Sequence, residues 1–156
     1  VADISYVPLQ AGSFLYLAIL MDLYSRRIVA WELRDHMKEG LVLAALREAI
    51  ALRNPRAGLI HHSDRGGQYA GKKYRGILDR AEICQSMSRA DSCYDNAFME
   101  SCFGTIKREL EMECYEDERA ARTEIRAYIR YYNPRRRHSS LDYLTPEEFE
   151  ASCFSN

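Results

Sequence analysis

The chain has 156 residues, 47% hydrophobic and 29% charged, which suffices for one domain with a buried core and is too short for two comfortable ones. Its formal net charge of −1 gives no overall attraction to a polyanion, so a nucleic-acid contact would need a local basic cluster. The five cysteines show neither a CxxC pair nor histidines at finger-like spacing, which argues against a structural zinc site and a disulfide framework. No apolar run reaches the length of a membrane span, so we expect a cytoplasmic protein with no membrane partner.

Three strands are predicted in the first part of the chain. Residues 1–7 are rich in β-branched side chains, contain Asp3 and end at a proline. Residues 14–21 form a continuous apolar run, which predicts a central strand buried on both faces. Residues 27–33 predict the third strand of an antiparallel meander. Asp22 lies in the turn before it, where an aspartate can accept hydrogen bonds from backbone N–H groups.

Helices and short strands alternate in the middle of the chain. Residues 40–53 predict a helix that is apolar over most of its circumference and covers the sheet. A short strand at 58–60 leads to residues 61–64 (HHSD), at the strand end where ligands gather in open α/β sheets. A helix opened by a Gly-Gly pair follows, and residues 83–87 predict another brief strand.

A further acid lies in a helix that Asp95 can cap. Asn96, Glu100, Gly104 and Lys107 are three or four residues apart, so they share one face of this helix. That face lines up a carboxylate, a small residue and a cation, as a surface that meets a phosphate backbone would. We therefore predict that Glu100 binds metal and that Lys107 and Asn96 contact DNA. The alternative is an ordinary amphipathic helix with a solvated glutamate and lysine.

A basic segment follows the last long helix. Residues 116–132 predict that helix, and Asn133 and Pro134 are expected to stop it. The segment itself consists of Arg135, Arg136, Arg137 and His138. With two tyrosines beside it, it combines cations and aromatic rings as nucleic-acid surfaces do, so we favour DNA contact over a solvated charge run. Residues 145–148 (TPEE) have the pattern of a capped helix start.

The order of these elements predicts an α/β fold with a mixed sheet, in which the first and fourth strands can lie side by side. Such a topology brings Asp3 near Asp64, and the helix of Glu100 completes a cluster of three carboxylates. Hard cations such as Mg²⁺ prefer oxygen ligands, so the cluster predicts a divalent-metal site. Imidazole suits Mg²⁺ less well, and His61 and His62 are expected to hydrogen-bond near the site rather than bind metal.

The spacing of the three acids also carries a family resemblance. Asp3, Asp64 and Glu100, with thirty-five residues between the last two and a lysine seven residues after the glutamate, resemble the D, D-x(35)-E catalytic core of integrases and insertion-sequence transposases. The stretches GLIHHSDRGGQY, CYDNAFMESCFGTIKREL and YIRYYNPRRRHSSLDYLTPEEF look like the same family, and the match runs from the first residue nearly to the last. The family often has Ser where this chain has Gly67, and Phe where it has Cys102.

The resemblance implies a ribonuclease H-like fold, with a mixed five-stranded sheet and helices on both faces. It also implies two Mg²⁺ ions, for which Mn²⁺ can substitute, and DNA cleavage and strand transfer at the ends of a mobile element. Carried over by position, Asp3 and Asp64 would bind the first ion, and Asp3 and Glu100 the second. The partners would be element ends and target DNA, with a homo-oligomer assembled on the DNA of a bacterial nucleoid.

Residues 1–133 are expected to form the catalytic core, and residues 134–156 a basic C-terminal extension with a short helix. Because the chain opens at Val1 in a strand rather than at Met, we expect an N-terminal DNA-binding region to be absent from it. Two other functions stay open. One is a metal-dependent nuclease that cuts without joining, which strand joining would exclude. The other is a non-catalytic DNA-binding or assembly module with solvated acids, which Mg²⁺-dependent nicking would exclude.

Overall fold

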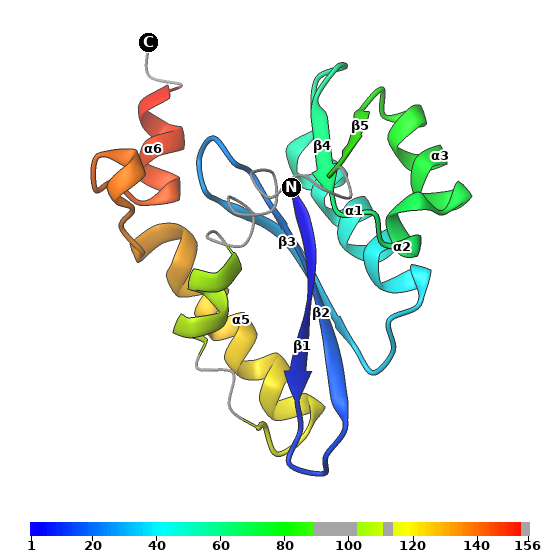
Figure 1. The fold of residues 1–156 in the computed structure, drawn as a ribbon. Coiled ribbons are helices and arrows are strands. Elements are labelled where there is room, and N and C mark those ends of the chain that lie inside the picture. Colours follow the sequence, from blue (N-terminus) through cyan, green and yellow to red (C-terminus); the bar gives the residue numbers. More distant parts are fainter. Residues whose placement is uncertain (89–102, 111–113, 154–156) are drawn as a thin grey trace.

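A three-stranded antiparallel sheet forms the centre of the fold, in a computed structural model that describes residues 1–88, 103–110 and 114–153 (Figure 1). Its strands are β1 (Ala2–Pro8), β2 (Phe14–Met21) and β3 (Ile28–Arg34), hydrogen-bonded in the order β1-β2-β3. The pairing of β1 with β2 sets Asp3 opposite Ile19. The predicted meander is therefore confirmed, with strand bounds close to those expected from the sequence.

Strand β2 is buried on both faces, as its continuous apolar run predicted. Leu15, Leu17 and Ile19 enter one hydrophobic core, whereas Ala18 and Leu20 enter another. Successive side chains of a strand point to opposite faces of the sheet, so this one strand lines both cores.

Helices cover both faces of the sheet (Figure 1). On one side, α1 (Glu39–Arg53) and α3 (Lys72–Arg80) form a core with the strands. On the other side lie α5 (Glu118–Arg135) and the helical residues 103–109. The side chains that these two helical segments bury include Phe103, Ile106, Ala121, Ile125 and Tyr132. None of the helices among the described residues is both long enough and apolar enough to cross a membrane.

Two short parallel strands continue the fold beside β1. β4 (Ile60–Ser63) pairs with β5 (Cys84–Met87), and β4 also contacts β1. The five expected strands are thus present, with the first and fourth side by side. They are hydrogen-bonded as a three-stranded and a two-stranded sheet rather than as one continuous sheet. β4 is only four residues long, so it meets β1 over a short stretch. The turn of helix α2 (Gly67–Ala70) follows β4 directly.

The sequence predicted that Asn133 and Pro134 would stop the last long helix. This prediction is wrong, because α5 runs through both residues to Arg135. Pro134 has no N–H to bond Arg130 O, but the helix continues past it, since Arg136 N still bonds Tyr132 O at 3.2 Å. The Asn133 side chain bonds the backbone of β3 instead of ending the helix. Its Oδ1 accepts from Ile28 N and its Nδ2 donates to Ile28 O, both at 3.0 Å.

The chain then forms the 3-10 turn η1 (Ser139–Leu141) and helix α6 (Pro146–Cys153). The predicted helix start is confirmed as a reciprocal cap. Glu148 Oε2 accepts from the Thr145 backbone N–H at 2.9 Å, and Thr145 Oγ1 accepts from the Glu148 N–H at 3.2 Å.

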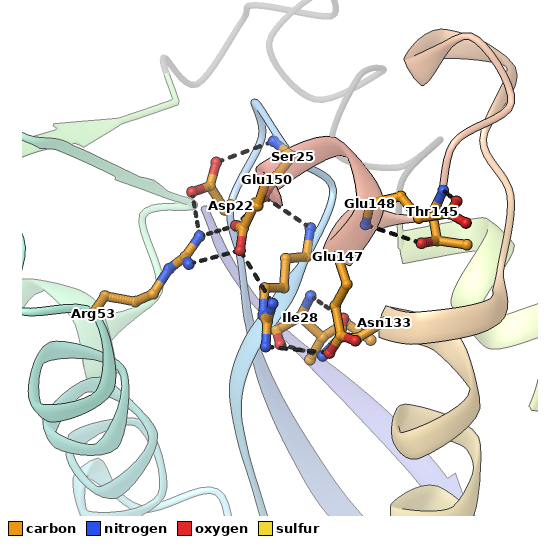
Figure 2. A network of polar contacts seen from close by, with 10 residues as sticks. Asp22, Ser25, Ile28, Arg53, Asn133, Thr145, Glu147, Glu148 and Glu150 are labelled. Carbon is orange, nitrogen blue, oxygen red and sulfur yellow. Dashed lines mark hydrogen bonds and ion pairs between the residues drawn. The ribbon is translucent and has the colours of Figure 1, made fainter. Parts of the chain in front are cut away.

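A polar network fastens α6 to the rest of the domain (Figure 2). Glu150 of α6 accepts from Ser25 Oγ at 2.7 Å and from Arg27 Nη1 at 3.1 Å, both in the turn between β2 and β3. It also forms a close ion pair with Arg53, at the end of α1, and Arg53 Nη2 bonds Asp22 Oδ2 at 2.9 Å. One carboxylate therefore ties together α6, α1 and the β2–β3 turn.

Replacing Glu150 with Gln removes the charge that two arginines share, and we expect the free energy of unfolding at pH 7 to fall by about 1–2 kcal/mol. Glu147→Gln is the matched control on the same helix. Glu147 is 44% exposed and meets Arg27 at 3.4 Å, so its replacement is expected to change the value by less than about 0.5 kcal/mol.

The effect of Glu150 depends on pH. Burial raises the pKa of Glu150, but hydrogen bonds from Arg53 and Ser25 lower it more, so its pKa lies below its ordinary value. The stabilisation is therefore present above the unfolded-state pKa and is lost as the pH falls through the folded-state pKa. Urea unfolding of the wild type and both variants at pH 7 and at about pH 3 measures this. Equal stability of wild type and Glu150→Gln at pH 7 would contradict the role.

Candidate active site

Asp3 lies in β1 on the face that carries the helical residues 103–109. Its Oδ2 is 3.4 Å from Lys107 Nζ, and its side chain is 27% exposed. Burial raises the pKa of Asp3 and outweighs the lowering effect of Lys107, and the negative charge of Asp64 raises the pKa further. The fold thus holds a carboxylate where its charge is incompletely solvated and where a second acid is near.

Asp64 follows the end of β4, the strand that contacts β1. Its Oδ1 accepts a hydrogen bond from the Gly66 N–H at 2.8 Å, which fixes the direction of the carboxylate. The structure therefore brings Asp3, in β1, and Asp64, directly after β4, within range of each other's charge.

Glu100 and Asn96, the predicted metal ligand and DNA contact of the next helix, lie outside the described residues. The helical residues 103–109 come three positions after Glu100. Phe103 and Ile106 are buried in the core, whereas Lys107 projects toward Asp3. The expected stripe of apolar residues and the separate face of Lys107 are thus both present in this part of the helix.

Asp22 belongs to the β2–β3 turn. Its Oδ1 accepts from the backbone N–H groups of Tyr24, at 2.9 Å, and Ser25, at 3.4 Å, while Oδ2 pairs with Arg53. The expected turn role is confirmed, and these contacts occupy both carboxylate oxygens.

The two histidines after β4 make hydrogen bonds within the fold. His61 is buried, and its Nε2 is 2.9 Å from the Tyr74 hydroxyl; burial lowers its pKa to about 3, so the ring is neutral at physiological pH. His62 Nδ1 lies 2.8 Å from Ser86 Oγ, and Nε2 lies 3.1 Å from Ser88 Oγ. Both rings therefore have hydrogen-bond partners, in line with the supporting role expected for them.

The basic residues 135–138, at the end of α5 and directly after it, divide into inward and outward residues. Arg136 forms a bidentate contact with Glu109, at the end of helix 103–109, and lies over the Tyr132 ring at 5.5 Å. His138 packs against the same ring, with centroids 5.2 Å apart. Arg135 and Arg137 are exposed. Arg136 therefore joins the helix that carries Lys107 to α5.

Tyr69 is an additional residue near the two aspartates, and sequence spacing does not indicate it. It lies in α2, is 2% exposed, and the charges of Asp3 and Asp64 both act on its hydroxyl. The signal available in the sequence is a tyrosine in an apolar position shortly after Asp64. A buried tyrosine usually needs a hydrogen-bond partner for its hydroxyl.

The donor set fits a hard divalent cation. Asp3 and Asp64 supply carboxylate oxygens from separate elements, and a bound cation would offset the charge that burial disfavours. Over residues 1–88, 103–110 and 114–153, no three His, Cys, Asp or Glu side chains come together as a metal site. The described residues thus include two of the three carboxylates that the sequence predicts, and the predicted third, Glu100, lies outside them.

Solved structures share this fold. A chain of the simian T-cell lymphotropic virus intasome, in complex with a PP2A regulatory subunit, matches 99% of this chain and 54% of its own length, with a TM-score of 0.81 and 14% identity. The HTLV-2 integrase catalytic core domain, in complex with magnesium, matches 95% of this chain and 92% of its own length, with a TM-score of 0.74 and 14% identity. The architecture is that of the ribonuclease H-like integrase catalytic cores.

Sequence comparison identifies the family. Two models of the integrase core domain match the chain, one over residues 1–93 and the other over residues 81–146. The chain belongs to the integrase core domain family. It is 43% identical over 150 residues to the transposase of insertion sequence element IS904 from Lactococcus lactis, and 39% identical over 150 residues to the transposase InsF of IS3A from Escherichia coli. These alignments cover 95% of this chain but 59% and 52% of the relatives, so the chain spans about half their length.

Exchanging Arg136 for Ala tests whether this arginine holds the fold together. We expect the free energy of unfolding to fall by about 1–3 kcal/mol, because the variant leaves the partly buried Glu109 without its cation. Arg135→Ala is the control, since Arg135 is exposed and its loss is expected to cost less than about 0.5 kcal/mol. Urea unfolding of both variants measures the difference, and equal stabilities would contradict the inward role of Arg136.

Two adjacent glycines allow a test of the Asp64 position. A Cβ atom on Gly66 would lie 2.9 Å from Asp64 Oδ1, whereas one on Gly67 would meet no described atom within 4 Å. We expect Gly66→Ala to turn the carboxylate away and to weaken Mn²⁺ binding by about tenfold, and Gly67→Ala to leave it unchanged. A Mn²⁺ binding isotherm followed by electron paramagnetic resonance compares them.

Proposed function

We propose that this chain is the catalytic domain of an insertion-sequence transposase, which cuts DNA at the ends of a mobile element and joins those ends to a target. The observation that carries the proposal is the pair formed by Asp3 and Asp64, two carboxylates that the contact between β1 and β4 brings within range of each other's charge. Membership of the integrase core domain family and the transposase relatives support the same reaction. The site of action would be the nucleoid, in the bacterial cytoplasm.

Asp3 and Asp64 would hold one Mg²⁺ ion, and Asp3 and Glu100 a second, with Mn²⁺ able to replace either. Two such ions activate the attacking oxygen and stabilise the leaving oxygen of an in-line displacement. The chain itself supplies the rigid frame, because strand pairing fixes Asp3 and the Gly66 N–H fixes Asp64. The HTLV-2 integrase core is known as a magnesium complex, which supports the choice of ion.

Lys107 is proposed to contact a DNA phosphate. Its ammonium lies on the same side as the Asp3 carboxylate and is 44% exposed, so a phosphate that approaches the carboxylates would also approach this cation. Arg135 and Arg137 are exposed and would add phosphate contacts. Arg136 and His138 would contribute to DNA binding by holding this segment in place, because both are packed against Tyr132.

The proposed partners are the element ends, the target DNA and further copies of this chain. Asn96 is proposed as a DNA contact on the helix of Glu100. The HTLV-2 core is described in dimeric and trimeric forms, which supports a homo-oligomer on DNA. The greater length of the relatives supports a separate DNA-binding region, since this chain aligns with about half of each.

Substitution of two aspartates at the same end of the sheet tests the proposal. Asp3→Asn is expected to abolish Mg²⁺-dependent nicking and joining of DNA, with little loss of stability, because its charge is already disfavoured by burial. Asp22→Asn is expected to retain both reactions and to cost about 1 kcal/mol through the turn. Plasmid nicking and strand-transfer assays in Mg²⁺ or Mn²⁺, together with urea unfolding, provide the measurements.

Each outcome separates the candidate functions. Loss of strand joining in Asp3→Asn, together with its retention in Asp22→Asn, would support the transposase. Nicking without joining would identify a metal-dependent nuclease instead. A folded wild type that binds DNA yet neither nicks nor joins it, with either metal, would leave a DNA-binding or assembly module.

A further inference from the structure

Tyr69 is held firmly in the fold beside the candidate active site. Its backbone N–H bonds Gly66 O at 3.0 Å, and its carbonyl accepts from Gln85 Nε2, on β5, at 2.9 Å. The ring meets that of Tyr74 edge to face, with centroids 5.3 Å apart. The phenol therefore has little freedom to turn toward a different partner.

The Tyr69 hydroxyl is buried and has no hydrogen-bond partner among the residues that the structure describes. Its neighbour Tyr74 differs in this respect, since the Tyr74 hydroxyl lies 2.9 Å from His61 Nε2. Leaving a buried polar group without a partner is unfavourable, and nearly all such groups in folded proteins are satisfied by protein or by ordered water. The hydroxyl thus requires a partner from outside the described side chains.

The surroundings of this hydroxyl indicate what kind of partner it takes. Burial, and then the charges of Tyr74, Asp3 and Asp64, raise the pKa of Tyr69, so the phenol stays protonated close to the two carboxylates. It bonds neither carboxylate directly. A Cβ atom on Gly66 would lie 2.9 Å from Asp64 Oδ1 and 3.6 Å from Cδ2 of the Tyr69 ring, so the ring lies beside the Asp64 carboxylate.

We propose that Tyr69 is a positioning residue whose hydroxyl oxygen accepts a hydrogen bond from a water molecule bound to the cation that Asp3 and Asp64 hold. This inference rests on the proposed function. Mg²⁺ usually keeps several waters when carboxylates bind it, and the cation polarises these waters into strong donors. A fixed acceptor on the buried side would orient the hydrated ion. Outer partners of this kind commonly change metal affinity by about 10–100-fold.

The test uses the two neighbouring tyrosines as a matched pair. Tyr69→Phe removes only the hydroxyl, and we expect it to weaken Mn²⁺ binding by about tenfold while the cation-free protein stays as stable as the wild type. Tyr74→Phe removes a hydroxyl that is already bonded to His61. It is expected to lower the unfolding midpoint of the cation-free protein and to leave Mn²⁺ affinity unchanged.

Two measurements on the whole chain read these effects. Mn²⁺ binding is followed by electron paramagnetic resonance, and the unfolding midpoint is recorded as a function of Mg²⁺ concentration, since an ion that binds the folded state raises it. Asp64→Asn serves as the reference for loss of the ion. Neither measurement requires DNA or turnover.

Wild-type affinity in Tyr69→Phe would overturn the inference, and so would a lower cation-free stability in that variant, because the hydroxyl would then have a permanent partner. If the wild type still nicks DNA with Mg²⁺ and Asp64→Asn does not, the proposed function would stand while the role of Tyr69 fails. A wild type that shows no response to either cation would overturn both.

Discussion

The contact between β1 and β4 is the constraint on which the candidate site depends. Asp3 lies near the start of β1 and Asp64 directly follows β4, so neither acid would come near the other without this contact. Burial and, to a smaller extent, the negative charge of Asp64 disfavour the ionised form of Asp3, as its raised pKa reflects. The rest of the domain supplies the packing that keeps the strands in place against this repulsion. A cation between the acids would turn an unfavourable arrangement into a favourable one.

Elements outside the aspartate pair are held in place by polar contacts as well as by core packing. Glu109 links helix 103–109 to Arg136, and Glu150 links α6 to Arg53 and the β2–β3 turn. The C-terminal segment therefore contributes to the frame of the domain. Its cations consequently differ in role, since Arg136 is bonded inward and Arg135 faces solvent.

Features with a local signature could be predicted from the sequence. The apolar run of β2, the turn role of Asp22 and the Thr145 cap each depend on residues close together in the chain, where periodicity and turn chemistry apply. The pairing of Arg53 with Glu150 could not be predicted, because it joins residues 97 positions apart. The lack of a hydrogen-bond partner for the Tyr69 hydroxyl among the described residues could not be predicted either, because it depends on which side chains surround the buried ring. Pro134 misled the prediction because the helix continues to Arg135, one residue past the proline.

The double burial of β2 has a consequence for how this domain can change over evolutionary time. A larger side chain on one face of β2 can be relieved only by shifting a strand that also lines the opposite core. The two helical layers therefore cannot diverge independently. Volume changes around Ala18 and Leu20 are expected to be accompanied in distant relatives by compensating changes around Leu17 and Ile19, although these two groups of residues belong to different cores.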